Sequence, residues 1–190
     1  MKKNKKDLWL ALDAYHFGHV VPEHLWDKVV EIFGGVDAST KAFAEKIARK
    51  LNWEKDFALV AISEYKKFVY LAVVSEFSVT PSKIIDQVWH EHVLFTAGYR
   101  KFCSEVIDFQ LDHNPELLQM ESEMGIFGAQ YEKTLELYRN EFNIDPPESI
   151  WGKTKFKKDQ VDLSQYEPKK KKSEDSNSSP DSSDNTVLWI

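Results

Sequence analysis

The amino-acid sequence predicts an all-α protein, with a single multi-helix bundle over residues 1–152 and a disordered tail over residues 153–190. Three observations favour this fold class. Apolar residues recur with helical spacing along nearly all of residues 1–152. Hydrophobic residues make up 42% of the chain and aromatic residues 13%, which is enough to form a buried core. No segment alternates convincingly between apolar and polar residues, as a half-exposed strand would.

The first two predicted helices lie before residue 36. Apolar residues from Leu8 to Tyr15 form a first amphipathic set. Pro22 can begin a second helix that runs to Phe33 and ends at Gly34. The apolar residues expected to face inward on this second helix are Leu25, Trp26, Val29, Val30 and Phe33.

Two further helices are predicted up to residue 77. Asp37 or Ser39 can cap the third, since both side chains accept hydrogen bonds from the backbone N–H groups of a first turn. Asn52 can cap a long fourth helix that continues to about Phe77.

The second half of the bundle begins at Thr80-Pro81, which we expect to act as cap and first helical residue. An apolar stripe follows over residues 84–106 and predicts one helix there. Asn114-Pro115 starts a further helical stretch, which we expect Gly125 and Gly128 to interrupt.

Charge and cysteine content exclude several classes of protein. The formal net charge is −6, so specific nucleic-acid binding, which rests on clustered basic residues, is not expected. The single cysteine, Cys103, excludes an intrachain disulfide framework and multi-cysteine metal sites. No apolar run approaches the roughly 18 residues of a membrane span. We therefore expect a cytoplasmic protein, or a nuclear one in a eukaryotic cell, because Pro168–Lys172 resembles a nuclear-import signal.

The tail suggests a docking function. Four lysines at Lys169–Lys172 precede the Ser/Asp/Asn-rich residues Ser173–Asn185, which contain no large apolar side chain. The chain then ends in four large apolar residues, Val187, Leu188, Trp189 and Ile190. These four residues can fill a pocket on a partner protein, with the spacer providing reach. The alternatives are a featureless end and a tail that is a substrate for post-translational modification.

Most of the chemistry-bearing residues fall within residues 81–115, which hold three of the six histidines. Asp86 and His90 are four residues apart, so on a helix they share a face. His92 lies on the other side of that helix, with the apolar stripe. His113 lies beyond the expected helix end, where the chain could return to either face.

Two interpretations of these residues compete. One is a site for a single divalent metal ion, zinc or iron, with ligands taken from Asp86, His90, His92 and His113. A straight helix cannot direct both His90 and His92 at one ion. The other interpretation is a buried polar network, in which Asp86 orients His90 and His113 caps a helix end.

The same segment resembles a known family. Its pattern D-x-x-W-H-x-H … Y-x-x-F-C … H-x-P is similar to the signature of the glycine-rich domain-containing protein-like family, on residues Asp86, Trp89, His90, His92, Tyr99, Phe102, Cys103, His113 and Pro115. The resemblance implies a helical fold and a shared site, but no established reaction. The tail of this chain differs from many bacterial members, because it is rich in Ser and Asp where theirs are rich in Gly and Cys.

Other residue clusters give weaker signals. Cys103 follows Phe102 on an apolar stripe, so we expect a buried core residue and not a nucleophile. We expect His16, His19 and His24 to be surface or capping residues. The leading functional prediction is therefore a non-enzymatic helical adaptor whose C-terminal tip docks a partner, and the alternative is a metal-dependent enzyme that uses the His/Asp site.

Overall fold

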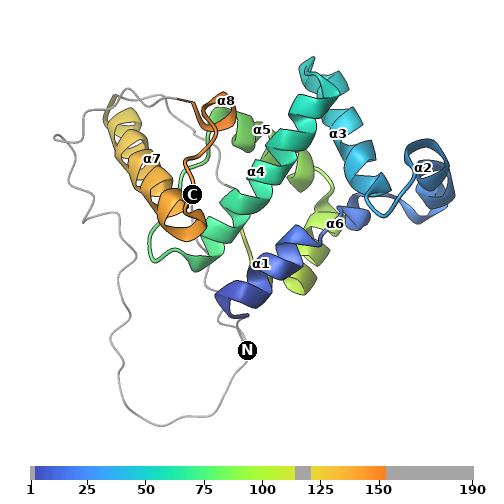
Figure 1. Ribbon diagram of the computed structural model, residues 1–190, viewed down its shortest axis with the longest axis horizontal. Helices are drawn as coiled ribbons and strands as arrows, with labels where there is room; N and C mark the ends of the chain where they lie inside the picture. The colour runs from blue at the N-terminus through green and yellow to red at the C-terminus, as the bar shows by residue number, and fades with distance from the viewer. Residues whose placement is uncertain (1–2, 114–120, 153–190) are drawn as a thin grey trace, which may run out of the picture.

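The computed structural model describes residues 3–113 and 121–152, and these residues form helices and no β-strand (Figure 1). The all-α prediction is confirmed. The elements in chain order are α1 (Lys5–Asp13), the 3₁₀ turns η1 (Gly18–Val20) and η2 (Glu23–Leu25), α2 (Trp26–Phe33), α3 (Ala38–Leu51), α4 (Lys55–Val74), α5 (Lys83–Val93), α6 (Thr96–Lys101), the π-helical segment η3 (Phe102–Ile107), α7 (Glu121–Phe142) and α8 (Glu148–Trp151).

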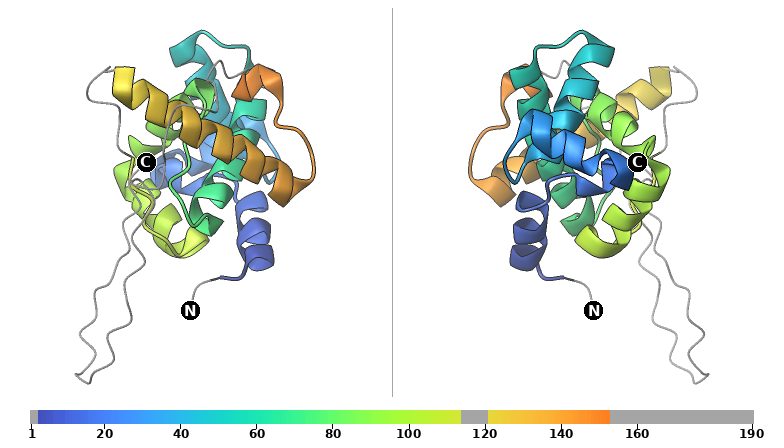
Figure 2. Two further views of the ribbon diagram at one scale, coloured as in Figure 1. Left: turned by 90° about the vertical axis from the view of Figure 1, so that its left-hand side faces the viewer. Right: turned by 90° about the vertical axis from the view of Figure 1, so that its right-hand side faces the viewer.

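Helix α4 lies at the centre of the molecule (Figure 1). It contacts α1, α3, α5 and α7, and α7 crosses it in the left view of Figure 2. Apolar side chains on several of its faces explain this position, because a helix that is apolar on most sides is stable only when it is surrounded. Its largest fully buried residues are Ile62, Tyr65, Phe68 and Leu71.

The start of α4 differs from the sequence prediction. Asn52 does not cap α4. It adopts a left-handed conformation with φ of 55° and ends α3. Asparagine tolerates this conformation better than most residues, which explains its use at a helix C-terminus. Helix α4 begins three residues later and ends at Val74, before the predicted end at Phe77.

The prediction for the second helix is wrong in two respects. Pro22 precedes the 3₁₀ turn η2, and the α-helix begins only at Trp26. None of the five residues expected to face inward is buried, although Val29 and Phe33 are partly covered. The helix packs on α3 and η2 at the edge of the molecule, so much of its apolar face has no covering element among the described residues (Figure 1).

The predicted helix over residues 84–106 is broken into three pieces. Ser82, and not Thr80, caps α5, and its hydroxyl accepts a 3.2 Å hydrogen bond from the Ile85 N–H. The chain changes direction after Leu94, and α6 then packs on η1. Gly98 permits this packing, since a Cβ atom there would lie 2.2 Å from the His19 carbonyl oxygen.

Helix α7 runs without interruption through Gly125 and Gly128, so the predicted interruption is wrong. Glycine within a helix costs only about 1 kcal/mol relative to alanine, and tertiary packing offsets such a cost. The predicted start at Asn114-Pro115 lies outside the described residues.

A buried carboxylate connects the central helix to α7 and α8. Glu64 of α4 accepts hydrogen bonds from the Tyr138 hydroxyl at 3.0 Å and the Trp151 indole at 2.8 Å. Its other oxygen forms an ion pair with Lys67 at 2.8 Å. The buried charge is therefore paired and hydrogen-bonded, which is the condition under which proteins tolerate one.

Candidate functional site

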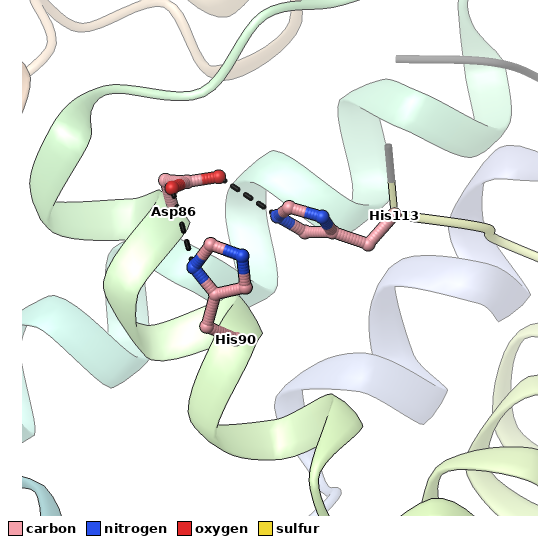
Figure 3. A group of neighbouring side chains, drawn as sticks. All are labelled: Asp86, His90 and His113. Atoms are coloured by element: carbon pink, nitrogen blue, oxygen red, sulfur yellow. Dashed lines mark hydrogen bonds and ion pairs between the residues drawn. The ribbon is translucent and has the colours of Figure 1, made fainter. Parts of the chain in front are cut away.

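The structure brings Asp86, His90 and His113 together. Asp86 and His90 are one turn apart on α5, and His113 returns to them from the segment after η3. The Asp86 carboxylate contacts both imidazole rings (Figure 3), with its Oδ1 2.8 Å from Nε2 of His113 and its Oδ2 3.4 Å from Nδ1 of His90. The two rings lie against each other, with centroids 4.2 Å apart.

This arrangement suits a single metal ion. One donor atom from each of the three residues can be chosen so that all lie within 4.8 Å of one another. Donors about 2.1 Å from a zinc or iron ion lie about 3–3.4 Å apart. The two Asp86–His contacts are close to that spacing but use different oxygens of Asp86, so binding one ion requires a side chain to move. His90 has a side chain 47% exposed, so it can rotate to complete the ligand set.

The site is open on one side. The His113 side chain is 6% exposed, whereas that of Asp86 is 36% exposed. A site with one buried and two accessible ligands leaves coordination positions that water or another small ligand can reach. Structural zinc sites differ, because four protein ligands close them.

Two aromatic residues of the sequence signature place His113. The Trp89 indole donates a 2.8 Å hydrogen bond to the Tyr99 hydroxyl, which donates in turn to the Leu111 carbonyl at 2.6 Å. The Trp89 and His113 rings meet at a centroid distance of 4.4 Å, nearly edge to face. Trp89 and Tyr99 therefore hold the chain at Leu111, two residues before His113 reaches Asp86.

Cys103 is a buried core residue, as the sequence predicts. Burial raises the pKa of its thiol, and this outweighs the opposite effect of the hydrogen bonds with the Leu111 backbone and the Tyr99 side chain. A thiol of this kind is a poor nucleophile at neutral pH.

His92 lies apart from the group formed by Asp86, His90 and His113. Its Nδ1 is 3.0 Å from the Tyr65 hydroxyl, and its ring is fully buried among aromatic side chains, including Phe17, Phe43 and Phe102. Burial, with a smaller contribution from His19, lowers the pKa of His92 to about 3, so the imidazole is neutral. Two residues from His90, it points to the opposite side of α5.

The three N-terminal histidines form no comparable group. His19 contacts Glu105, His24 is exposed, and the His16 carbonyl accepts a hydrogen bond from Ser39. Across residues 3–113 and 128–152, whose side chains the structure describes, Asp86, His90 and His113 form the one group of three potential ligands with this proximity.

Glu91 anchors the helix that carries the site, a role that the sequence analysis did not predict. Glu91 lies between His90 and His92 in the sequence, and its side chain is buried against α3. Lys46 and Lys50 of α3 bind one carboxylate oxygen each. Burial opposes ionisation, but the two lysines outweigh it and lower the pKa of Glu91. Both partners are more than 40 residues away, so helical periodicity alone could not find them.

The predicted docking tip, Val187, Leu188, Trp189 and Ile190, lies outside the described residues, as does the basic segment Pro168–Lys172. Partner recruitment and nuclear import therefore stay predictions. Within the described part of the chain, no helix is both long and apolar enough to cross a lipid bilayer.

Comparison with known proteins identifies one family. No curated protein and no solved structure matches the chain significantly. The family model described as UCP032817-like matches residues 38–146, a range that begins with α3 and contains all three residues of the candidate metal site. The resemblance to the glycine-rich domain-containing protein-like family stays a prediction. Because the match covers more than half of the sequence, this chain belongs to the UCP032817-like family.

Proposed function

We propose that this protein binds one divalent transition-metal ion through Asp86, His90 and His113, and that the ion acts on a ligand at its open coordination positions. The observation that carries the proposal is the convergence of two imidazoles on one carboxylate, with His113 arriving from a separate segment. A local hydrogen bond between Asp86 and His90 needs only one helix turn. The third donor requires the chain after η3 to return to α5.

The ligand set indicates which metal ions fit. Two imidazoles and a carboxylate bind zinc or iron(II), whereas magnesium and calcium prefer oxygen donors alone. Sets of two histidines and one carboxylate occur in catalytic zinc sites and in non-haem iron sites, both of which keep positions free for water or substrate. A metal-dependent enzyme is the function class that this geometry supports best.

The surroundings define the part each residue would play. His113, held by the Trp89–Tyr99–Leu111 contacts, supplies a rigid donor. Asp86 and His90 supply donors at the exposed side, where a bound water or a substrate oxygen has access. An ion in this position would lower the pKa of bound water or polarise a substrate carbonyl or phosphoryl group.

The test is metal analysis of the full-length, untagged protein, purified without chelator or nickel resin. Elemental analysis and native mass spectrometry should find close to one zinc or iron ion per chain. His90→Ala and His113→Ala should each lose the ion while the far-UV circular dichroism spectrum stays helical. His24→Ala is the matched control, because His24 is exposed and outside the group, and it should keep the ion.

Two results would contradict the proposal. A folded wild-type protein that neither carries nor takes up zinc or iron would make Asp86, His90 and His113 a hydrogen-bonded network. A metal ion that persists in His113→Ala would place the metal elsewhere.

A non-enzymatic adaptor function is the second candidate. The observation that favours it is the sequence of the tail, where Ser173–Asn185 separates the bundle from four large apolar residues. Deleting residues 186–190 should abolish recovery of a partner protein in a pull-down from the native host. Unchanged recovery would exclude this role for the tip.

A further inference from the structure

Helix α2 presents an apolar face to solvent. Of the nine large hydrophobic residues that are exposed in the described part of the chain, five lie between residues 25 and 36. Trp26 is 43% exposed and Val36 is 86% exposed. The other three are Leu25, Val30 and Ile32. A concentration of this kind marks an interaction surface more often than scattered apolar residues do.

The residue pattern on α2 is amphipathic, with apolar and acidic side chains on different faces of the helix. Trp26 and Val30 are four residues apart on α2, so they share a face of the helix. Leu25 in η2 and Val36, which follows the helix end at Gly34, flank the two ends of α2. Asp27 and Glu31 are four residues apart on α2 and, with Glu23 in the preceding turn η2, form an exposed acidic stripe. α3 and η2 contact the helix, but its position at the edge of the molecule leaves this apolar face uncovered by the described residues (Figure 1).

We propose that residues 187–190 of the same chain dock on the apolar face of α2, and that Lys169–Lys172 pair with its acidic stripe. The apolar parts match in size. The eight residues of α2 are about 12 Å long at 1.5 Å per residue, and four extended residues span about 13 Å. Leu188 and Trp189 are the side chains with the most apolar area to bury there.

Charge complementarity supports the same occupant. The tail carries four consecutive lysines before the tip, and α2 carries the exposed carboxylates of Asp27 and Glu31, with that of Glu23 in η2 just before it. Pairs of this kind are individually weak, but they favour one orientation of the tail over the other.

The tail is also long enough. Residues 153–186 connect the end of the described bundle to the tip, and extended chain of that length reaches on the order of 110 Å. A 20-residue helix such as α4 spans about 30 Å. The tip can therefore reach α2 from Gly152 along any path over the surface.

A second copy of the chain fits the face less well. A two-fold contact between α2 helices would bring the acidic stripes of two copies together, which is unfavourable. An eight-residue helix, about 12 Å long and 10–12 Å wide, also covers far less than the 800 Å² or so per partner of a stable interface.

Hydrogen–deuterium exchange by mass spectrometry on the full-length chain tests the proposal. In the wild-type protein, amides of α2 should exchange at least about threefold more slowly than in the double variant Leu188→Ser/Trp189→Ser. Amides of α4 should exchange equally in both. The double variant Ser178→Ala/Ser179→Ala, changed only within the spacer, is the control and should match the wild type.

The outcomes separate the occupants. Equal exchange of α2 in the wild type and the tip variant would overturn the proposal. Protection of α2 that disappears on dilution would also overturn it, because the tip would then dock on a second copy. Zero-length carbodiimide cross-links between Lys169–Lys172 and Asp27 or Glu31, formed at every protein concentration and lost in the tip variant, would support docking within one chain. None of these results depends on the metal content of the protein.

Discussion

The hydroxyl of Tyr99 donates a 2.6 Å hydrogen bond to the carbonyl oxygen of Leu111, and this contact connects the helical part of the sequence signature to its distant histidine. Tyr99 also accepts the indole N–H of Trp89. Trp89 lies in α5 and Tyr99 in α6, whereas Leu111 lies two residues before His113 in the segment after η3. The position of His113 therefore depends on a hydroxyl group that contacts neither Asp86 nor His90.

Tyr99→Phe should reveal this dependence. The change keeps the ring and leaves two buried groups, the Trp89 N–H and the Leu111 carbonyl, without their partner. We expect a loss of about 2 kcal/mol in the free energy of unfolding, measured by urea denaturation. We also expect metal affinity to fall about tenfold or more, as when other positioning contacts at metal sites are removed. Tyr15→Phe is the matched control, because the buried Tyr15 hydroxyl has no hydrogen-bond partner, and equal effects of both changes would contradict the assignment.

Gly98→Ala should destabilise the protein, although alanine normally favours a helix. The added Cβ would lie 2.2 Å from the carbonyl oxygen of His19, so α6 and η1 would have to separate. We expect a loss of about 3 kcal/mol in the free energy of unfolding, opposite in sign to the gain of up to 1 kcal/mol or so from helix propensity. In Gly18→Ala the nearest atom would be 4.0 Å away, and thermal denaturation should find that variant close to the wild type.

Part of the candidate site follows from local sequence. Asp86 and His90 are four residues apart on a predicted helix, so their contact could be predicted from periodicity, as could the separation of His90 from His92. The return of His113 could not, because it rests on the Tyr99–Leu111 hydrogen bond and on the break in the helix after Leu94. Both are tertiary features. The apolar periodicity over residues 84–106 continues without interruption across Leu94, so it gives no sign of the break.

Two errors in the helix predictions arise because local sequence patterns do not report tertiary packing. Periodicity identifies an apolar face, but it does not say what covers that face, so Leu25, Trp26 and Val30 were expected inside and lie exposed. Glycine propensity predicts an interruption at Gly125 and Gly128, whereas α7 continues because packing of the whole helix outweighs two local costs.

Glu64→Ala should be among the most destabilising single changes. The substitution removes a buried carboxylate and leaves Lys67 charged, with the Trp151 indole and the Tyr138 hydroxyl deprived of their acceptor. Removing one partner of a buried ion pair costs about 3–5 kcal/mol, and urea denaturation followed by circular dichroism would measure it. Glu76→Ala changes an exposed carboxylate just beyond α4 and should stay within about 0.5 kcal/mol of the wild type. A similar small effect at Glu64 would show that the network does not join α4 to α7 and α8.

The burial of His92 predicts how stability depends on pH. Its folded pKa of about 3 lies below the ordinary histidine value of 6.5, so between these values the unfolded chain binds a proton at this residue that the folded chain does not. The stability contributed by the neutral ring is thus fully present above pH 6.5 and is lost as the pH falls toward 3. Between pH 7 and pH 5 the loss amounts to about 2 kcal/mol.

His92→Leu removes the titrating group, so urea denaturation of this variant should show a pH dependence flatter by that amount, whatever its stability at pH 7. His24→Ala, which removes an exposed imidazole, should keep the wild-type slope. Identical slopes in all three proteins would mean that the imidazole of His92 gains its proton in the folded state as readily as in the unfolded one.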